Sequence, residues 1–195
     1  MKRRVVLSSS CTVILTGCST PAKIRSWRIA PVPGKVRVGI GSRIGIRSIG
    51  LPSAMSQTGV PEPGGTYMAN TFSNDLWAAP LAAMLQTVMV ENLTQRLPSD
   101  IILAEGGAIG AAPDQLIEIQ VLAFTPNAAG EILLSAQLAI RPVESHKWQF
   151  KNLYVNASGG QMAETIVAAM SSLWGEAADC LAGMLTRNET GVTLG

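Results

Sequence analysis

In three closely spaced segments in the middle of the chain, side chains of one kind recur at every second residue, as they do in half-buried strands. They run over residues 117–123, 132–140 and 148–154. On their repeating faces lie Ile117, Ile119, Val121 and Ala123; Ile132, Leu134, Ala136, Leu138 and Ile140; and Trp148, Phe150, Asn152 and Tyr154. The connections over 125–130 and 141–147 are of turn length. An antiparallel meander of three strands is therefore predicted.

Two other segments repeat their apolar residues at helical spacing. The first begins near Asn74 or Asp75, either of which could cap it, has Pro80 in its opening turn and stops at Pro98. Its apolar positions are Leu81, Met84, Leu85, Val88, Leu93 and Leu97, and its polar face carries Gln86, Glu91, Gln95 and Arg96. The second covers about residues 160 to 185 and has a continuous apolar stripe that contains several methionines. Both are predicted to be amphipathic packing helices.

The first third of the chain has weaker patterns. Residues 36–46 alternate apolar side chains with arginine and glycine, which predicts a half-buried strand pair or one long bent strand. Residues 51–71 are rich in Pro, Gly and Ser and predict a loop. Residues 18–35 contain three prolines and are predicted to be a tether.

The order strand, helix, several strands, helix predicts an α+β fold, with a mostly antiparallel sheet and two long amphipathic helices packed on one face. The length of 195 residues suits one domain with a real core. We assign this domain to residues 36–186 and expect a disordered tail over 187–195.

The N-terminus has the sequence features of an export signal peptide. Lys2, Arg3 and Arg4 precede a short apolar stretch, which ends in the sequence Leu15-Thr16-Gly17-Cys18. This sequence resembles a bacterial lipobox, which implies that residues 1–17 are a signal peptide and that Cys18 becomes the acylated first residue. By the sorting pattern of such lipoproteins, Ser19 implies the outer membrane and a domain facing the periplasm. An ordinary signal peptide containing a cysteine, or an uncleaved anchor, is the alternative.

Processing changes the charge and the cysteine inventory. Loss of Lys2, Arg3 and Arg4 takes Lys+Arg from 15 to 12 against 13 Asp+Glu, so the formal net charge moves from +2 to −1. Cys11 leaves with the signal and Cys18 carries lipid, which leaves Cys180 without a partner for an internal disulfide.

A run of basic residues follows the signal. Between Cys18 and Pro61 there are seven Lys or Arg residues and no acidic one. A solvated tether and strand face is one interpretation. The other is contact with anionic lipid head groups or an acidic partner, for which Arg37, Arg43 and Arg47 are the candidates.

The sequence has few candidates for catalysis. The single histidine, His146, lies beside Ser145 and Lys147 in a predicted turn and has no nucleophile-elbow context. There is no histidine pair or cysteine pair for zinc and no phosphate-binding glycine loop with its lysine. We therefore expect no enzymatic activity, no cofactor and no nucleic-acid partner, while a hydrolase using Ser145 and His146 remains a hypothesis to be tested.

Two motifs mark the first predicted helix, Trp77-Ala78-Ala79-Pro80-Leu81 near its start and Glu91-Asn92-Leu93 near its end. Together with the lipobox, the segment from Val38-Gly39 to Leu51-Pro52, and a hairpin that Phe124, Gly130 and Leu134 could match, they resemble the PqiC-type family of ABC-transport auxiliary lipoproteins. The resemblance covers residues 36–185. In that family Trp77, Pro80, Leu81, Asn92 and Leu93 would be structural motif residues. The sequence departs from the family at residues 53–60, which affects any partner contact made there.

The resemblance implies a non-enzymatic outer-membrane lipoprotein, with acyl and diacylglycerol groups on Cys18 as its only modification. It would dock the periplasmic conduit of an inner-membrane ABC complex, formed by an MCE (mammalian-cell-entry) domain protein that conducts lipid. Self-association into a homo-oligomeric ring would suit a tubular partner. The alternative function is a structural lipoprotein that supports envelope or outer-membrane assembly.

Overall fold

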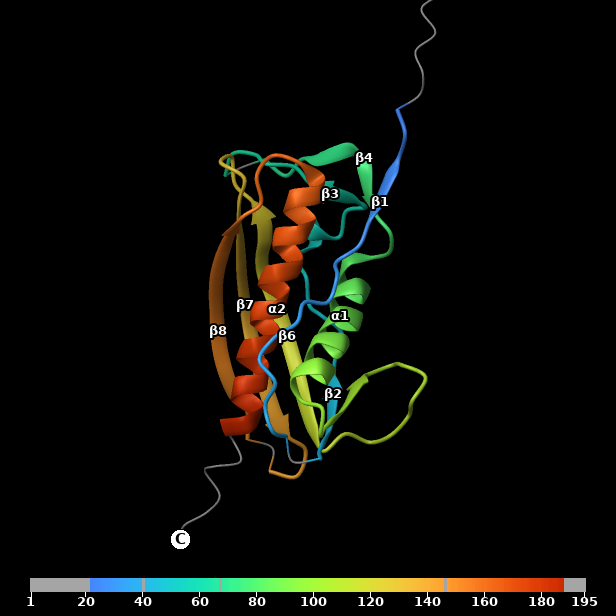
Figure 1. Cartoon of the computed structure of the whole chain (residues 1–195), viewed down its shortest axis with the longest axis vertical. Helices are drawn as coiled ribbons and strands as arrows, with labels where there is room; N and C mark the ends of the chain where they lie inside the picture. The colour runs from blue at the N-terminus through green and yellow to red at the C-terminus, as the bar shows by residue number, and fades with distance from the viewer. Residues whose placement is uncertain (1–21, 40, 67, 146, 188–195) are drawn as a thin grey trace, which may run out of the picture.

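The computed structural model describes residues 22–39, 41–66, 68–145 and 147–187. Cys18, Ser19, His146 and residues 188–195, on which several predictions fall, lie outside this range. The elements are β1 (Arg25–Trp27), β2 (Arg43–Ile46), the 3-10 turn η1 (Ser53–Met55), β3 (Gly59–Pro61), β4 (Thr71–Trp77), α1 (Leu81–Arg96), β5 (Ile101–Ala104), β6 (Gln115–Pro126), β7 (Glu131–Pro142), β8 (Gln149–Ser158) and α2 (Ala163–Arg187) (Figure 1).

The larger sheet has five strands in the order β5-β2-β6-β7-β8. β6, β7 and β8 form the predicted antiparallel meander, with nearly continuous pairing along their length. β2 pairs in parallel with both β5 and β6, because the chain crosses over through α1 before it returns as β5. The α+β fold is confirmed, and the sheet is mixed at the edge formed by β5, β2 and β6.

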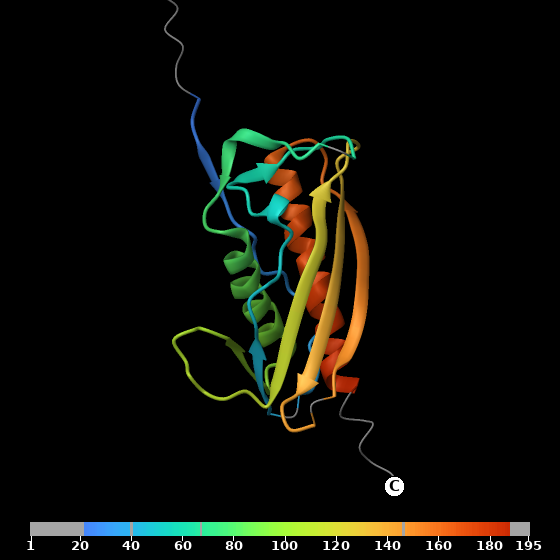
Figure 2. The ribbon, with the colours of Figure 1, turned by 180° about the vertical axis from the view of Figure 1, so that it is seen from behind.

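Both helices cover the same face of this sheet, and the opposite face is open when the molecule is viewed from behind (Figures 1 and 2). The core lies between the layers. The fully buried Trp174 of α2 stacks on Phe124 of β6 with ring centroids 6.1 Å apart, and its indole N–H donates to the Leu85 carbonyl at 2.9 Å. Phe150 and Tyr154 of β8 lie on the open face, each 73% exposed. No helix among the described residues is long and apolar enough to cross a membrane.

A smaller sheet, in the order β1-β4-β3, occupies one end of the molecule (Figure 1). It corrects two predictions. Residues 51–71 are not simply a loop, because η1 and β3 lie within them. Asn74 and Asp75 are not helix caps, because Thr71–Trp77 pairs as a strand with both neighbours; α1 begins at Leu81 with Pro80 at the N-cap position.

The strand predicted over residues 36–46 is also wrong in part. Only Arg43–Ile46 forms a strand, and Val36 and Val38 are 62% and 85% exposed. The preceding segment runs instead along the helices, where the backbone N–H of Arg37 donates to the Arg96 carbonyl at 2.7 Å.

Candidate functional site

β1 joins the N-terminal end of the described chain to the small sheet. It pairs in parallel with β4, with Arg25 opposite Asp75 and Trp27 opposite Trp77. The Arg25 guanidinium and the Trp27 indole donate to the buried Asp75 carboxylate at 2.8 and 2.7 Å. The hydrogen bond from Arg25 lowers the pKa of Asp75 below its ordinary value, because it favours the charged carboxylate.

Residues 28–37, which we call the N-terminal strap, then run between and along α1 and α2. Ile29 is 3% exposed, the Ala30 N–H donates to the Ser171 hydroxyl at 3.1 Å, and the Val32 N–H donates to Oδ1 of Asn92 at 2.8 Å. The prediction of a tether over residues 18–35 is therefore wrong from β1 onward. Backbone groups of the strap find fixed partners on both helices, which makes it part of the domain predicted to start at residue 36.

Arg96 of α1 fastens the strap to α2. Its side chain is 1% exposed, and its Nε and Nη2 donate to the two carboxylate oxygens of Asp179, both at 3.0 Å. Nη1 donates to the Val32 carbonyl at 2.9 Å and Nη2 to the Gly175 carbonyl at 3.1 Å. Gly34 leaves room for this arrangement, since a Cβ atom there would collide with the guanidinium.

The prediction that Arg96 lies on the polar face of its helix is wrong. Residue 96 stands four positions after Asn92 and three after Leu93, so it lies on the buried face, and that spacing was the available signal. A charged side chain is expected to be exposed unless it has partners. The partners of Arg96 come from α2 and the strap, which its own helix does not indicate.

The residues of the two sequence motifs lie in or beside the core. Trp77 ends β4 and is 8% exposed, while Leu81 and Leu93 are buried on α1. Pro80 is exposed at the start of the helix, and Asn92 is fully buried and holds the strap.

A cavity of about 260 Å³, which we call the end pocket, lies at the end of the molecule that carries the small sheet. Its lining comes from η1, β3, β4, the start of α1, the loop after β3 and the end of β6, and includes Met55, Pro61, Met68, Trp77, Leu122 and Phe124. A bulge in β6 between Val121 and Ala123 shapes one wall. It leaves Leu122 52% exposed and turns Phe124 into the core, which breaks the alternation predicted for Ala123.

The predicted basic contact residues are already partnered. The Arg43 guanidinium donates to both oxygens of Asp114, at 2.6 and 3.1 Å, and holds the pKa of Asp114 at about 2. Arg47 pairs with Glu118 at 2.6 Å and with Glu105 at 3.4 Å.

Arg37 differs from these two, because its Nη2 donates to the backbone carbonyl of Asp179 at 3.4 Å. Arg37 thus contacts α2, while Arg43 and Arg47 pair with acids on or beside strands of the large sheet.

The structure gathers few chemically reactive groups. Ser145 is exposed, and His146 lies outside the described residues. Cys180 is a free, partly buried thiol on α2. In the part of the chain that the structure describes, no group of three or more His, Cys, Asp or Glu side chains could hold a metal ion.

Comparison with known sequences and structures extends these findings. Residues 29–182 match the family described as "ABC-type transport auxiliary lipoprotein component". The chain is 22% identical over 180 residues to the intermembrane transport lipoproteins PqiC of Escherichia coli K12 and Shigella flexneri, covering 89% of this chain and 92% of each relative.

Two solved structures share the fold. An uncharacterized protein has a TM-score of 0.71 at 14% identity, covering 84% of this chain and 99% of its own. Protein XCC0632 from Xanthomonas campestris has a TM-score of 0.66 at 12% identity, covering 88% of this chain and 100% of its own.

Proposed function

This chain belongs to the ABC-type transport auxiliary lipoprotein family, as its motifs predicted, and from that membership we propose that it is the lipid-anchored accessory subunit of an intermembrane lipid transport system. We place it at the outer membrane, facing the periplasm, where it docks the conduit of an inner-membrane ABC complex. The proposed conduit is an MCE-domain protein. The two PqiC relatives carry the name of intermembrane transport lipoproteins, which supports transport as the process.

The observation that carries the proposal is the small number of residues between Cys18, the predicted lipidation site, and the folded domain. Cys18 precedes Ala22, the first described residue, by only four residues, and β1 begins at Arg25. Four residues span at most about 14 Å even when fully extended. Lipid on Cys18 would therefore hold the β1 end of the domain beside the bilayer.

With such an anchor, the function of the protein is to hold its domain at the membrane where a partner arrives. The several acyl chains of a bacterial lipoprotein hold a domain far more durably than one chain does. A domain confined to a thin layer beside the membrane meets an arriving partner at a raised effective concentration, so modest contacts suffice for docking.

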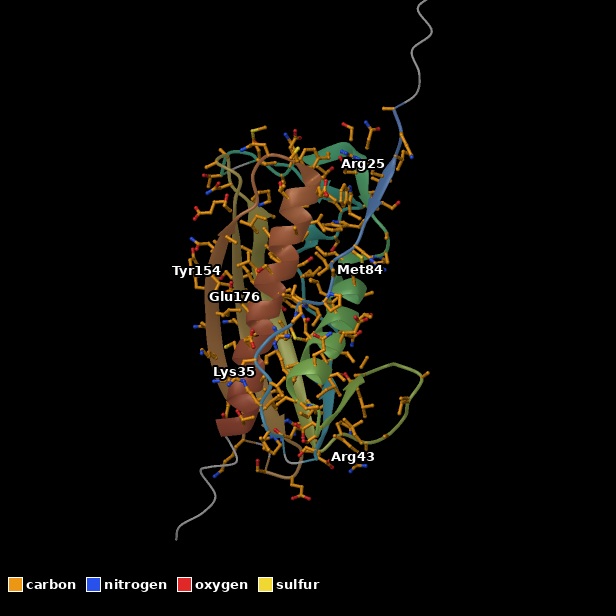
Figure 3. All side chains as sticks on the ribbon, viewed as in Figure 1. Arg25, Lys35, Arg43, Met84, Tyr154 and Glu176 are labelled. Atoms are coloured by element: carbon orange, nitrogen blue, oxygen red, sulfur yellow. The ribbon has the colours of Figure 1, made fainter. Side chains whose placement is uncertain are left out.

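The family is described as a transport component and not as an enzyme. Energy coupling and the lipid path belong, in our proposal, to the partner subunits, and this chain has no catalytic step or cofactor. Arg43 lies at the end of the long axis opposite Arg25, and so away from the bilayer (Figure 3). Of the two contacts that the sequence allowed for Arg37, Arg43 and Arg47, we therefore propose the acidic partner. A homo-oligomer would multiply any such contact around a tubular conduit.

Affinity capture from the envelope tests the proposal. The full chain with a C-terminal tag is solubilised in mild detergent and purified, beside a Cys18→Ala control made in the same cells. We expect an MCE-domain protein to copurify with the parent chain and to be depleted with the control. Its absence from the parent sample, with the partner present in the envelope, would contradict the proposal. If cells that carry the Cys18→Ala variant show envelope defects but no defect in lipid transport, the alternative function of a structural lipoprotein is favoured.

A further inference from the structure

The end pocket lies at the end of the molecule that carries β1 and the small sheet. β1, β3 and β4 lie together at the end of the molecule where the described chain begins, in both views of the ribbon (Figures 1 and 2). Arg25 and Arg43 mark opposite ends of the long axis, and the end pocket belongs to the end of Arg25 (Figure 3). If Cys18 is acylated, the short link that follows it brings this end to the bilayer surface.

The lining changes in polarity from mouth to interior. Gln57, Thr66 and Asn70 are exposed, whereas Trp77 and Phe124 are buried inside. Glu62 is the one charged residue among the described lining residues, and it too is exposed. The buried part of the lining is apolar, so the part of a ligand that enters the pocket is apolar. The Glu62 carboxylate at the mouth favours a head group that carries an ammonium group beside its phosphate.

The volume fits part of a hydrocarbon chain. A 150 Å³ protein cavity is large enough for benzene, and on that scale 260 Å³ has room for roughly ten carbon atoms. Methionines line the cavity at Met55 and Met68, and Met68 is 61% exposed at its mouth. Their unbranched side chains adapt to flexible apolar ligands.

We propose that the end pocket receives one acyl chain of a phospholipid from the membrane that anchors the protein. The inference rests on the proposed function, since acylation of Cys18 is what brings the mouth of the pocket to the bilayer. The head group stays among the exposed polar residues, and the terminal half of the chain reaches Trp77 and Phe124.

Photo-crosslinking tests the proposal on the full acylated chain in vesicles of phosphatidylethanolamine and phosphatidylglycerol. A small fraction of the phosphatidylethanolamine carries a diazirine near the end of one acyl chain. After irradiation, mass spectrometry locates the adducts. We expect adducts on the buried Trp77 or Phe124, which a chain reaches only by entering the pocket.

Three matched variants sharpen the test. Ala54→Trp and Ala123→Trp narrow the cavity from η1 and from β6, and each should reduce the interior adducts at least five-fold. Ala111→Trp adds the same side chain to an exposed loop at the opposite end and should leave them unchanged. Unfolding curves of all three identify a variant that has lost its fold, and Ala54, being exposed, is the safer of the two narrowing positions.

Adducts confined to exposed residues such as Met68, or interior adducts that neither narrowing variant reduces, would overturn the proposal. Partner capture, measured on the same chains, separates it from the proposed function. Retained capture with no interior adduct in the parent chain refutes the acyl site alone. A third outcome is that the unsubstituted chain has no interior adduct while both narrowing variants fail to copurify the partner. That outcome would assign the pocket to a partner polypeptide and overturn the acyl proposal.

Discussion

Arg96 gives the sharpest test of how the N-terminal strap is held. The substitution Arg96→Met keeps an unbranched side chain of similar length but removes all five N–H donors. It removes one hydrogen bond from each of the carbonyls of Val32, Asn92 and Gly175, and it takes away the cation that pairs with Asp179. The strap then keeps its hydrogen bonds to Asn92 and Ser171.

The magnitude follows from the number and burial of these contacts. A hydrogen bond from a charged donor contributes about 1.5–3 kcal/mol, and three carbonyls lose one each, so we take the lower end of that range. Asp179 is 37% exposed, so water replaces part of the lost ion pair and its share must be discounted. We expect the free energy of unfolding to fall by about 4 kcal/mol, within the range for breaking a buried pair. For a domain of this size the melting temperature would fall by about 10 °C.

The assay is thermal and urea unfolding of the full chain in detergent, followed by far-ultraviolet circular dichroism. Arg47→Met is the matched control, because Arg47 forms its ion pairs with 44% of its side chain exposed and should change stability by less than about 1 kcal/mol. Trypsin should also cleave Arg96→Met faster at Lys35 and Arg37 under native conditions. If Arg96→Met and Arg47→Met unfold within 1 kcal/mol of each other, the strap is not held as described.

Three further predictions concern close packing and charge. Gly34→Ala should lower the melting temperature by displacing the Arg96 guanidinium, whereas Gly110→Ala, whose Cβ meets open space, should not; equal melting curves would contradict this. Asp114 has a folded pKa of about 2, below its ordinary 3.8, so its stabilising effect is complete above about pH 4 and is lost as the pH falls toward 2. The stability gap between the parent and Asp114→Asn should close over that interval in acid titrations, and a constant gap would refute the assignment. Because Arg43 lies at the end of the molecule opposite Arg25, Arg43→Gln should leave sedimentation with anionic vesicles unchanged; weaker sedimentation would contradict the proposed orientation on the membrane.

The sequence was sufficient for the elements with long, regular patterns. β7 and α2 were predictable because each buries a continuous periodic set of apolar residues, such as Ile132 to Ile140 and Ile166 to Leu181. The family was predictable from short motifs whose residues turned out to lie in or beside the core.

The strap and the end pocket were not predictable in the same way. Ile29 and Val32 have no periodic neighbours, and their places depend on Asn92, Arg96 and Ser171, which are distant in the sequence. The end pocket depends on short strands that pair only in the folded domain. It also depends on a bulge in β6 that the pattern of apolar residues does not predict.

The decisive measurement for lipid anchoring is the mass of the mature protein in the outer-membrane fraction. We expect cleavage before Cys18, with acyl and diacylglycerol groups on that residue and the protein held in this fraction. A mature N-terminus without lipid, or a protein released freely by osmotic shock, would contradict it.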